Sequence, residues 1–512
     1  MRQGEAGISM QRSVLTDIVR HHAAKTPDAI ALVFEERETS FAALDRHASQ
    51  VANGLIAAGL HPGDRVAYLG KNSDLYFEYW LGAAKAGIVL VPINWRLAPP
   101  EVAYILGDCE PRMVLADPEF LDRLDTDAGY KPMSTSDFAT WRDAQDATDP
   151  AREAGYDDAV LQLYTSGTTG NPKGALLSNR SLLALRQDTP VDRMPAWNRW
   201  TAKDVALIAM PIFHISGSGW GMWSLQHGGK GIVVREFDPH QVLDLLTRYR
   251  ITKIMMVPTA MKIVCDHPDA AGTDFSFLQT ICYGGSAIPL DLMRQAIAVF
   301  GCGFAQMYGM TETAGTIVGL PPEDHDPDGN ARMRGIGVPL PGVEVRIVGE
   351  DGIELPRGAV GEIATRSTAN MIAYYNRPDA TAETVDSDGW LRTGDAGYMD
   401  EDGYLYLADR IKDMIITGGE NVYPAEVENA LYSHPDVADV AVIGVSDPKW
   451  GEAVKAIVVP VEGRTPDPAA LIAWARERIA AYKAPKTIAF RETLPRNPSG
   501  KILRRLLRDE YR

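Results

Sequence analysis

Short apolar runs of strand length alternate with helical patterns along this chain of 512 residues. The runs at 205–209 and 253–257 have the length of buried strands, and apolar side chains recur at helical spacing from Leu292 to Phe300. Such alternation is typical of α/β folds with largely parallel sheets, because two parallel strands must be joined by a long crossover. We therefore expect an α/β fold.

The length of the chain exceeds what one ordinary core can bury, so we expect two or more domains. A smaller unit begins after residue 410 or so, where Pro424 can occupy the first turn of a helix. Strand-like runs follow at 438–445 and 455–461, then a helical pattern at 469–480 and a strand-like run at 487–490. This pattern is long enough for a small domain of its own.

Several classes of protein are disfavoured by composition. The formal charge of -17 argues against a broad nucleic-acid surface, which needs a basic excess. No apolar run is long enough to span a membrane, and the first thirty residues or so lack a signal peptide, so we expect a cytoplasmic protein. The four cysteines form no CxxC pair and the histidines form no HExxH motif, so a structural metal is not predicted.

The segment 163–174 carries three glycines, four serine or threonine hydroxyls and one lysine. Glycines allow backbone N–H groups to approach phosphate oxygens, and Lys173 adds a positive charge. The spacing differs from a Walker loop, because Gly167 and Gly170 are three apart and Gly174 follows Lys173. Taken alone, the segment predicts either a phosphate-binding loop or a plain surface loop.

Four further segments carry candidate functional side chains, each with a plainer alternative. The segment 308–312 follows a strand-like run and ends in Glu312, which could equally be solvated in a turn. The segment 389–395 ends in Asp395, suited to accept ribose hydroxyls or to form an Asx-turn. The segment 409–421 can be a charged linker with a glycine pair. The segment 495–501 is a loop that presents Lys501 ahead of a basic helix.

Together, and in this order, the segments 164–174, 308–312, 390–395, 409–421 and 495–501 resemble the adenylate-forming enzyme superfamily, specifically its acyl-CoA synthetases (fatty-acid and aryl-acid CoA ligases). The resemblance covers nearly the whole chain. It implies a large N-terminal domain, 1–411, built of α/β subdomains with mixed and parallel sheets, which binds ATP and the acyl group. It also implies a small mobile α+β domain, 412–512, that closes over an active site between the two.

The resemblance implies ATP, Mg²⁺ and coenzyme A as the cofactors and assigns roles by position. Thr311 would contact the α-phosphate, Glu312 would hold Mg²⁺, and Lys501 would be the lysine of the adenylation step. Lys412 matches the hinge of the small domain, and Asp395 with Arg410 matches the ribose contacts. The other matches are the phosphate loop (Thr165, Ser166, Gly167, Thr168, Thr169, Gly170, Lys173), the adenine strip (Gly284, Gly285, Ser286, Ala287), Tyr308 and Gly309, and the pantetheine channel (Gly418, Gly419, Glu420).

The segment 211–221 matches one wall of the acyl pocket in these enzymes, with His214 at its mouth or simply packed. Amino-acid-activating relatives usually carry an Asp in this segment, and none lies between Met210 and Trp220, so an amino-acid substrate is disfavoured. We expect a hydrophobic acid of medium length or with a ring. Its chain length, branching and aromaticity cannot be read from the sequence. The predicted neighbours of the acid are His214, Gly219, Trp220, Tyr283 and Met307.

We therefore predict an ATP-dependent acyl-CoA synthetase that forms an acyl-adenylate, releases pyrophosphate and then transfers the acyl group to CoA. The nearest alternative transfers the acyl group to the phosphopantetheine of a carrier protein. A non-catalytic nucleotide- or acyl-sensing protein is a second alternative, disfavoured by the matches at Glu312, Asp395 and Lys501. The expected partners are a small carboxylic acid, ATP and CoA, with no nucleic acid and no integral membrane segment; the sequence leaves a homodimer open.

Overall fold

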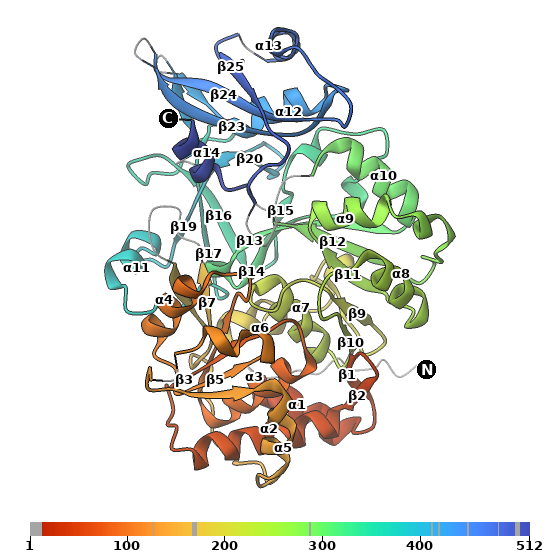
Figure 1. Cartoon of the computed structure of the whole chain (residues 1–512), viewed down its shortest axis with the longest axis vertical. Helices are drawn as coiled ribbons and strands as arrows, with labels where there is room; N and C mark the ends of the chain where they lie inside the picture. The colour runs from red at the N-terminus through yellow and green to blue at the C-terminus, as the bar shows by residue number, and fades with distance from the viewer. Residues whose placement is uncertain are drawn as a thin grey trace.

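The computed structural model describes residues 13–125, 127–165, 172–285, 288–410, 413–417, 420–447, 450–479, 481–496 and 502–511. These residues form four sheets covered by helices (Figure 1). The expected α/β class is confirmed. Within the described ranges, no helix is both long and apolar enough to cross a membrane.

The first sheet has the strand order β15-β14-β13-β12-β11-β9-β10-β1-β2, and its central strands from β13 to β1 are parallel. The expected strands at 205–209 and 253–257 are its β9 and β11. The bounds are β1 (Ile30–Phe34), β2 (Arg37–Ser40), β9 (Val205–Ile208), β10 (Lys230–Val233), β11 (Lys253–Met256), β12 (Thr280–Gly284), β13 (Gly303–Met310), β14 (Gly315–Leu320) and β15 (Val338–Pro339).

Both faces of this sheet are buried, which explains the nearly continuous apolar runs of its strands. Leu207 packs with the helices α8 (Pro239–Arg248), α9 (Pro258–Cys265) and α10 (Leu290–Phe300). Its neighbours Ala206 and Ile208 belong to the core shared with α3 (Asp74–Ala86) and α7 (Ile215–Gln226). Successive side chains of a strand point to opposite faces. The expected helix at Leu292–Phe300 is α10.

The second sheet has the order β18-β8-β7-β4-β3-β5-β6 and shares the larger core with the first. The third is antiparallel, in the order β16-β17-β19-β20. The bounds are β3 (Arg65–Leu69), β4 (Val89–Ile93), β5 (Met113–Ala116), β6 (Lys131–Ser134), β7 (Ala159–Thr165), β8 (Lys173–Ser178), β18 (Ala373–Tyr374), β16 (Val343–Val348), β17 (Gly361–Ser367), β19 (Leu391–Met399) and β20 (Leu405–Arg410).

The fourth sheet forms the small unit at the blue end of Figure 1, with the order β22-β21-β24-β23 and β25 beside β24. The expected helix after Pro424 and the strands at 438–445, 455–461 and 487–490 are present. The helices α12 (Pro424–Tyr432) and α13 (Pro468–Arg476) pack on one face of this sheet and α14 (Arg504–Glu510) on the other. The bounds are β21 (Ile415–Thr417), β22 (Glu420–Val422), β23 (Val437–Asp447), β24 (Gly451–Pro460) and β25 (Thr487–Phe490).

The α-helices of the described ranges are α1 (Leu15–Lys25), α2 (Phe41–Ala57), α3 (Asp74–Ala86), α4 (Pro99–Cys109), α5 (Thr135–Asp143), α6 (Asn179–Gln187), α7 (Ile215–Gln226), α8 (Pro239–Arg248), α9 (Pro258–Cys265), α10 (Leu290–Phe300), α11 (Pro378–Thr384), α12 (Pro424–Tyr432), α13 (Pro468–Arg476) and α14 (Arg504–Glu510). Three 3-10 turns matter below: η2 (Ala196–Asn198), η3 (Pro268–Gly272) and η4 (Thr311–Thr313).

Candidate active site

The candidate phosphate loop is held at both ends by the hairpin of β7 and β8. Thr165 and Lys173 are opposite each other in this hairpin, and the Thr165 hydroxyl donates to the Lys173 carbonyl oxygen at 3.5 Å. The loop residues between them, 166–171, lie outside the described residues. The hairpin therefore brings the last residue before the loop and the lysine after it together at one edge of the second sheet.

Glu312 lies in η4, directly after β13, and is 5% exposed. The Tyr374 hydroxyl donates to Glu312 Oε1 at 2.6 Å, and the Met371 N–H donates to the Glu312 carbonyl oxygen at 2.7 Å. Glu312 Oε2 accepts no hydrogen bond from any described residue. A carboxylate oxygen left open in this way fits Mg²⁺, which prefers oxygen ligands.

Tyr374 also connects Glu312 to the phosphate loop. Its strand, β18, pairs with β8, and the ammonium of Lys173 lies 4.9 Å from the centre of the Tyr374 ring. Thr311 is the first residue of η4 and so lies beside the same carboxylate. The structure thus brings Lys173, Thr311 and Glu312 into one region, and their roles toward ATP stay predictions.

Asp395 lies on β19 and is 9% exposed. The Tyr308 hydroxyl donates to Asp395 Oδ2 at 2.8 Å, which joins the end of β13 to the third sheet. Asp395 is also paired with Arg410 across the β19–β20 ladder. An ionised carboxylate can accept several hydrogen bonds, so this position suits a sugar with two hydroxyls.

Three glycines allow backbone segments to approach closely at the ends of β12 and β13. A Cβ atom at Gly284 would lie 2.2 Å from the Met307 carbonyl oxygen, and one at Gly309 would lie 1.9 Å from that of Gly315. Gly285 has φ +81°, which favours glycine. At Gly284 and Gly309 the neighbouring backbones approach each other with no side chain between them, and adenine binding at this edge stays a prediction.

His214 lies at the N-cap position of α7, with its ring 4.7 Å from that of Phe213. Its Nε2 is buried and has no partner among the described residues. Burial, and secondarily the charge of Arg96, lowers the pKa of His214 to about 4. The ring is therefore neutral at neutral pH. Gly217, in the same segment, permits close packing, because a Cβ there would lie 2.3 Å from the Pro211 carbonyl oxygen.

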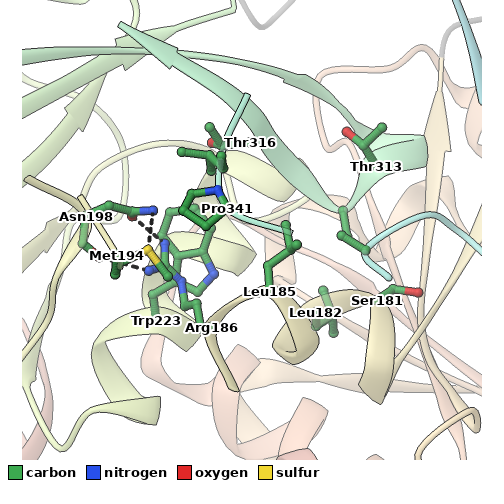
Figure 2. Close-up of a pocket in the computed structure, with 13 residues that line it drawn as sticks. Ser181, Leu182, Leu185, Arg186, Met194, Asn198, Trp223, Thr313, Thr316 and Pro341 are labelled. Atoms are coloured by element: carbon green, nitrogen blue, oxygen red, sulfur yellow. Dashed lines mark hydrogen bonds between the residues drawn. The ribbon is translucent and has the colours of Figure 1, made fainter. Parts of the chain in front are cut away.

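Two cavities flank the segment that carries His214. Figure 2 shows the first, the Arg186 cavity, which lies between α6, η2, α7 and the start of β14. The second, the Arg96 cavity, lies between the β9–α7 turn and α9. The first is lined by Ser181, Leu182, Leu185, Arg186, Met194, Asn198, Trp223, Thr313, Ala314, Thr316, Leu340, Pro341 and Ala369. The second is lined by Asn72, Trp95, Arg96, Ala209, Met210, Pro211, Arg235, Glu236, Phe237, Val257, Thr259, Ala260 and Ile263.

None of the five residues predicted to contact the acid lines either of these cavities. Trp220 is buried against Trp200, with ring centres 4.8 Å apart. Tyr283 donates to Gln306 Oε1 at 3.3 Å and lies 2.9 Å from His325 Nε2. Met307 lies in the core of the first sheet, and Gly219 lies on α7 behind His214. Their contact with the acid stays a prediction.

Many of the predicted site residues lie outside the described residues, and their roles also stay predictions. Arg410 and Glu420 lie in β20 and β22, but only their backbone is described. The others are Ser166, Gly167, Thr168, Thr169, Gly170, Ser286, Ala287, Lys412, Gly418, Gly419 and Lys501.

Sequence reasoning missed three residues that the structure places beside Glu312 or in the two cavities. Tyr374 orients Glu312 from 62 positions away. Arg186 is the cation of the first cavity, and Arg96 is one of the two arginines that line the second. Each is an ordinary polar or charged residue in its own segment, so only spatial proximity reveals it.

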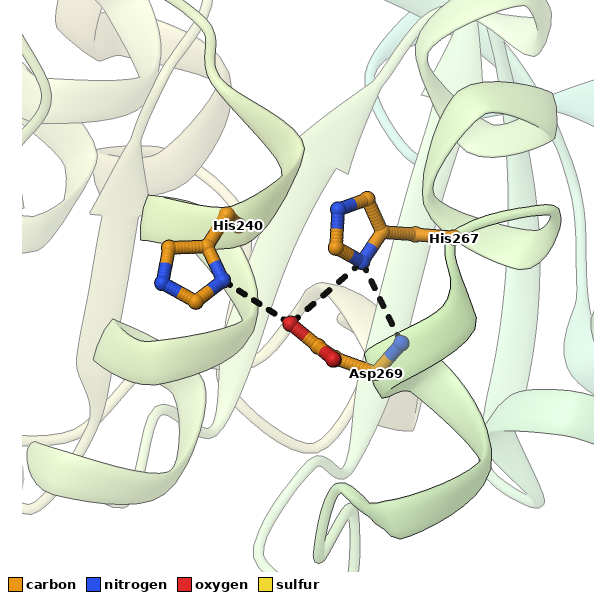
Figure 3. Close-up of side chains that lie close together, drawn as sticks. All are labelled: His240, His267 and Asp269. Atoms are coloured by element: carbon orange, nitrogen blue, oxygen red, sulfur yellow. Dashed lines mark hydrogen bonds and ion pairs between the residues drawn. The ribbon is translucent and has the colours of Figure 1, made fainter.

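A separate cluster of His240, His267 and Asp269 lies on α8 and η3 (Figure 3). Within the described ranges, these three side chains are the ones whose potential ligand atoms lie close enough together to hold a metal ion. His240 Nδ1 lies 2.9 Å from Asp269 Oδ2, and His267 Nδ1 accepts the Asp269 N–H at 3.3 Å. Because His267 thereby caps η3 and the other two side chains are exposed, these contacts account for the cluster as a surface cap.

Comparison with known proteins agrees with this geometry. The AMP-binding enzyme family matches residues 19–375, and the AMP-binding enzyme C-terminal domain matches residues 426–501. The chain is 43% identical to fatty acid–[acyl-carrier-protein] ligase ScoC of Streptomyces coeruleorubidus, over 98% of this chain and 97% of that protein. It is 40% identical to feruloyl-CoA synthase of an Amycolatopsis species, over 96% and 97%.

The fold is likewise similar to a solved structure, that of ATP-bound MatB from Rhodopseudomonas palustris. The TM-score is 0.88 at 33% identity, covering 97% of this chain and 99% of that one. The similarity therefore extends over the first three sheets and over the small unit that contains the fourth. The chain belongs to the AMP-binding enzyme family and is an AMP-forming acid–thiol ligase.

Proposed function

We propose that this enzyme activates a hydrophobic carboxylic acid with ATP as an acyl-adenylate and then transfers the acyl group to coenzyme A. The observation that carries the proposal is the convergence of Lys173, Tyr374 and Glu312 beside β13, next to the Tyr308–Asp395 pair. These groups supply a cation, an open carboxylate oxygen and a sugar-binding carboxylate within one region.

The first step requires a carboxylate to attack the α-phosphorus of ATP, so two anions must be brought together. Lys173 and Lys501 would offset this repulsion, and a preorganised charge of this kind is commonly worth about 3 to 4 kcal/mol in rate. Mg²⁺ held by Glu312 would neutralise phosphate charge. Tyr374 would keep the Glu312 carboxylate turned toward the phosphates through its hydrogen bond.

In the second step a thiol attacks the acyl-adenylate and AMP leaves. The Arg96 cavity supports an entry path for this thiol, because it adjoins the Met210–Pro211 turn that leads to His214. Arg96 and Arg235 in its wall, which pair with Glu236 at 3.8 Å and Asp117 at 3.1 Å, would also be within reach of a phosphate-bearing arm. Both CoA and the phosphopantetheine of a carrier protein bear phosphate, so the identity of the acceptor requires experiment. The similarity to ScoC, named as a carrier-protein ligase, favours testing the carrier as the second candidate.

Pyrophosphate release from ATP and Mg²⁺ tests the proposal across short, long, branched and aryl acids, each with and without CoA. We expect continuous release that requires both an acid and CoA. A single acid-dependent burst that CoA does not turn over would favour the carrier protein as acceptor. Absence of release with every acid would contradict the catalytic proposal.

We also propose a division at 411/412, with residues 412–512 moving as a lid, and a cytoplasmic protein that binds no nucleic acid. The acidic charge of -17 supports the last point. Cell fractionation tests the location, and light scattering tests whether the protein is a homodimer. A shift of the small domain between ATP-bound and CoA-bound states, measured by a fluorescent pair on the two domains, tests the lid.

A further inference from the structure

The Arg186 cavity contains a positive charge that the fold does not neutralise. Arg186 is the one charged residue among those that line it. Its guanidinium donates to the Asn198 carbonyl oxygen at 3.0 Å and to Asn198 Oδ1 at 2.8 Å, and it lies 3.8 Å from the centre of the Trp223 ring. Arg186 forms no ion pair with a described carboxylate.

These contacts leave much of the guanidinium unused. An arginine has five N–H donors, and the two bonds to Asn198 use two of them. Burial lowers the pKa of Arg186 to about 9, so the group is still charged at neutral pH. A desolvated cation without a partner is costly. A ligand anion would remove that cost.

A second cation lies behind the first. Lys253 is 4% exposed, and its ammonium reaches the Trp197 carbonyl oxygen at 3.4 Å and lies 5.4 Å from the centre of the Trp200 ring. Burial lowers its pKa, and the charge of Arg186 acts in the same direction. Asp204 acts on it electrostatically, but Lys253 forms no ion pair with any carboxylate in the described ranges. Two cations therefore flank η2 in a chain that is strongly acidic overall.

The Arg186 cavity has a volume of about 30 Å³, which suits the end group of an acid, and residues next to Glu312 in the sequence help to line it. Thr313 and Ala314, which directly follow Glu312, line the cavity, and Figure 2 shows Thr313 across it from Arg186, Asn198 and Met194. The side chains between these ends include Leu182, Leu185, Leu340 and Pro341. An acid whose reacting carboxylate lies near Glu312 would place its far end at the guanidinium.

We propose that the acid activated by this enzyme carries a second anionic group at its far end, a carboxylate or sulfonate, which Arg186 binds through its unused N–H donors. This inference rests on the proposed function and narrows its substrate class to acids with an apolar middle and two anionic ends. Arg186 is then the specificity-determining residue, and Lys253 adds to the positive potential behind it.

Matched pairs of a monoacid and a diacid test the proposal: butanoate with butanedioate, hexanoate with hexanedioate, and benzoate with benzene-1,4-dicarboxylate. Wild-type enzyme should show a kcat/KM for at least one diacid that exceeds that of its monoacid about tenfold or more. Arg186→Met should lower this ratio about 10- to 100-fold, the range expected for losing hydrogen bonds to a charged group. Arg186→Lys, which keeps the charge, should restore part of the ratio.

Arg180→Met is the matched control, because Arg180 lies on the same helix but pairs with Asp157 at the surface. The ratio of kcat/KM for the diacid to kcat/KM for the monoacid should be the same in Arg180→Met as in wild type. Preference for the monoacid in every pair, or an Arg186→Met ratio equal to wild type, would overturn the proposal.

Direct binding separates this proposal from the catalytic one. Calorimetric titration of each diacid into wild-type and Arg186→Met protein requires no turnover. Binding that weakens tenfold or more in Arg186→Met supports the inference even if no acid releases pyrophosphate. Equal binding to both proteins, or no diacid binding to wild type, contradicts it. Equal thermal unfolding of the two proteins would show that Arg186→Met is folded.

Discussion

At the scale of single residues, the hydrogen bond from Tyr374 to Glu312 is the contact most directly tied to ATP chemistry. Tyr374→Phe removes the donor but keeps the ring beside Lys173. Hydrogen bonds to charged groups are worth about 1.5 to 3 kcal/mol, so acid-dependent pyrophosphate release should slow about tenfold or more. The Mg²⁺ concentration for half-maximal rate should also change, which a purely structural role would not cause.

Tyr375→Phe is the control for this prediction, because the Tyr375 ring stacks on Arg65 and its hydroxyl donates to no described residue. It should leave both the rate and the Mg²⁺ requirement as in wild type. If Tyr374→Phe matches wild type in both, Tyr374 does not position Glu312.

His214 makes a prediction about pH at the same scale. Its folded pKa of about 4 lies below the unfolded value of about 6.5, so the unfolded chain binds the extra proton first. The free energy of unfolding should therefore fall as pH drops from about 6.5 toward 4, by about 2 kcal/mol at pH 5 for this residue. His214→Gln should lose less stability than wild type between pH 7 and pH 5 in urea denaturation.

Burial also lowers the pKa of His227 to about 4, so part of the acid sensitivity should survive in His214→Gln. His61→Gln, at an exposed position, is the control and should follow the wild-type curve. Identical curves for His214→Gln and wild type would contradict the burial of a neutral ring at 214.

At the scale of elements, the close approach of β13 and β14 depends on Gly309. A Cβ there would meet the Gly315 carbonyl oxygen at 1.9 Å, and because that atom belongs to the backbone, the strands must separate. Gly309→Ala should lower the free energy of unfolding by about 1 to 3 kcal/mol, the usual range for overpacking, and should weaken ATP binding. Urea denaturation and nucleotide titration measure the two effects.

Gly107→Ala provides the contrast, since a Cβ at this exposed position in α4 meets nothing within 4 Å. It should leave stability unchanged or raise it by about 0.5 to 1 kcal/mol, because alanine favours helix. A Gly309→Ala protein as stable as wild type would mean that β13 and β14 can separate there at little cost.

At the scale of the whole molecule, the two half-reactions should depend on different faces of the small domain. Lys501→Ala should abolish adenylation, because a charge on the reacting phosphate is lost, yet leave thioester formation from pre-formed acyl-adenylate intact. Single-turnover assays of each half-reaction measure this separation. Lys486→Ala, an exposed lysine of the same unit, should affect neither. Loss of both half-reactions in Lys501→Ala would contradict the division of labour.

The sequence by itself determined the fold class, the positions of most elements and the motifs of the active site. These are local properties: the apolar run of β9 and the glycines beside Lys173 are legible in a few consecutive residues. The residues that line the acyl pocket could not be predicted from such local patterns, because the direction of a side chain depends on its packing. Trp220 and Tyr283 are buried in the two cores on either side of the first sheet, and their predicted contact with the acid stays a prediction.

Only the tertiary structure decided which distant residues meet. Glu312 and Tyr374 are 62 positions apart, and Tyr308 and Asp395 are 87 apart. Arg186 reaches a cavity whose other end is formed by the turn after Glu312. Strand register and the packing of one sheet on another set these contacts. Neither produces a recognisable pattern in the sequence around each residue. The chemistry was therefore predictable from the chain, whereas the charge that selects its substrate was not.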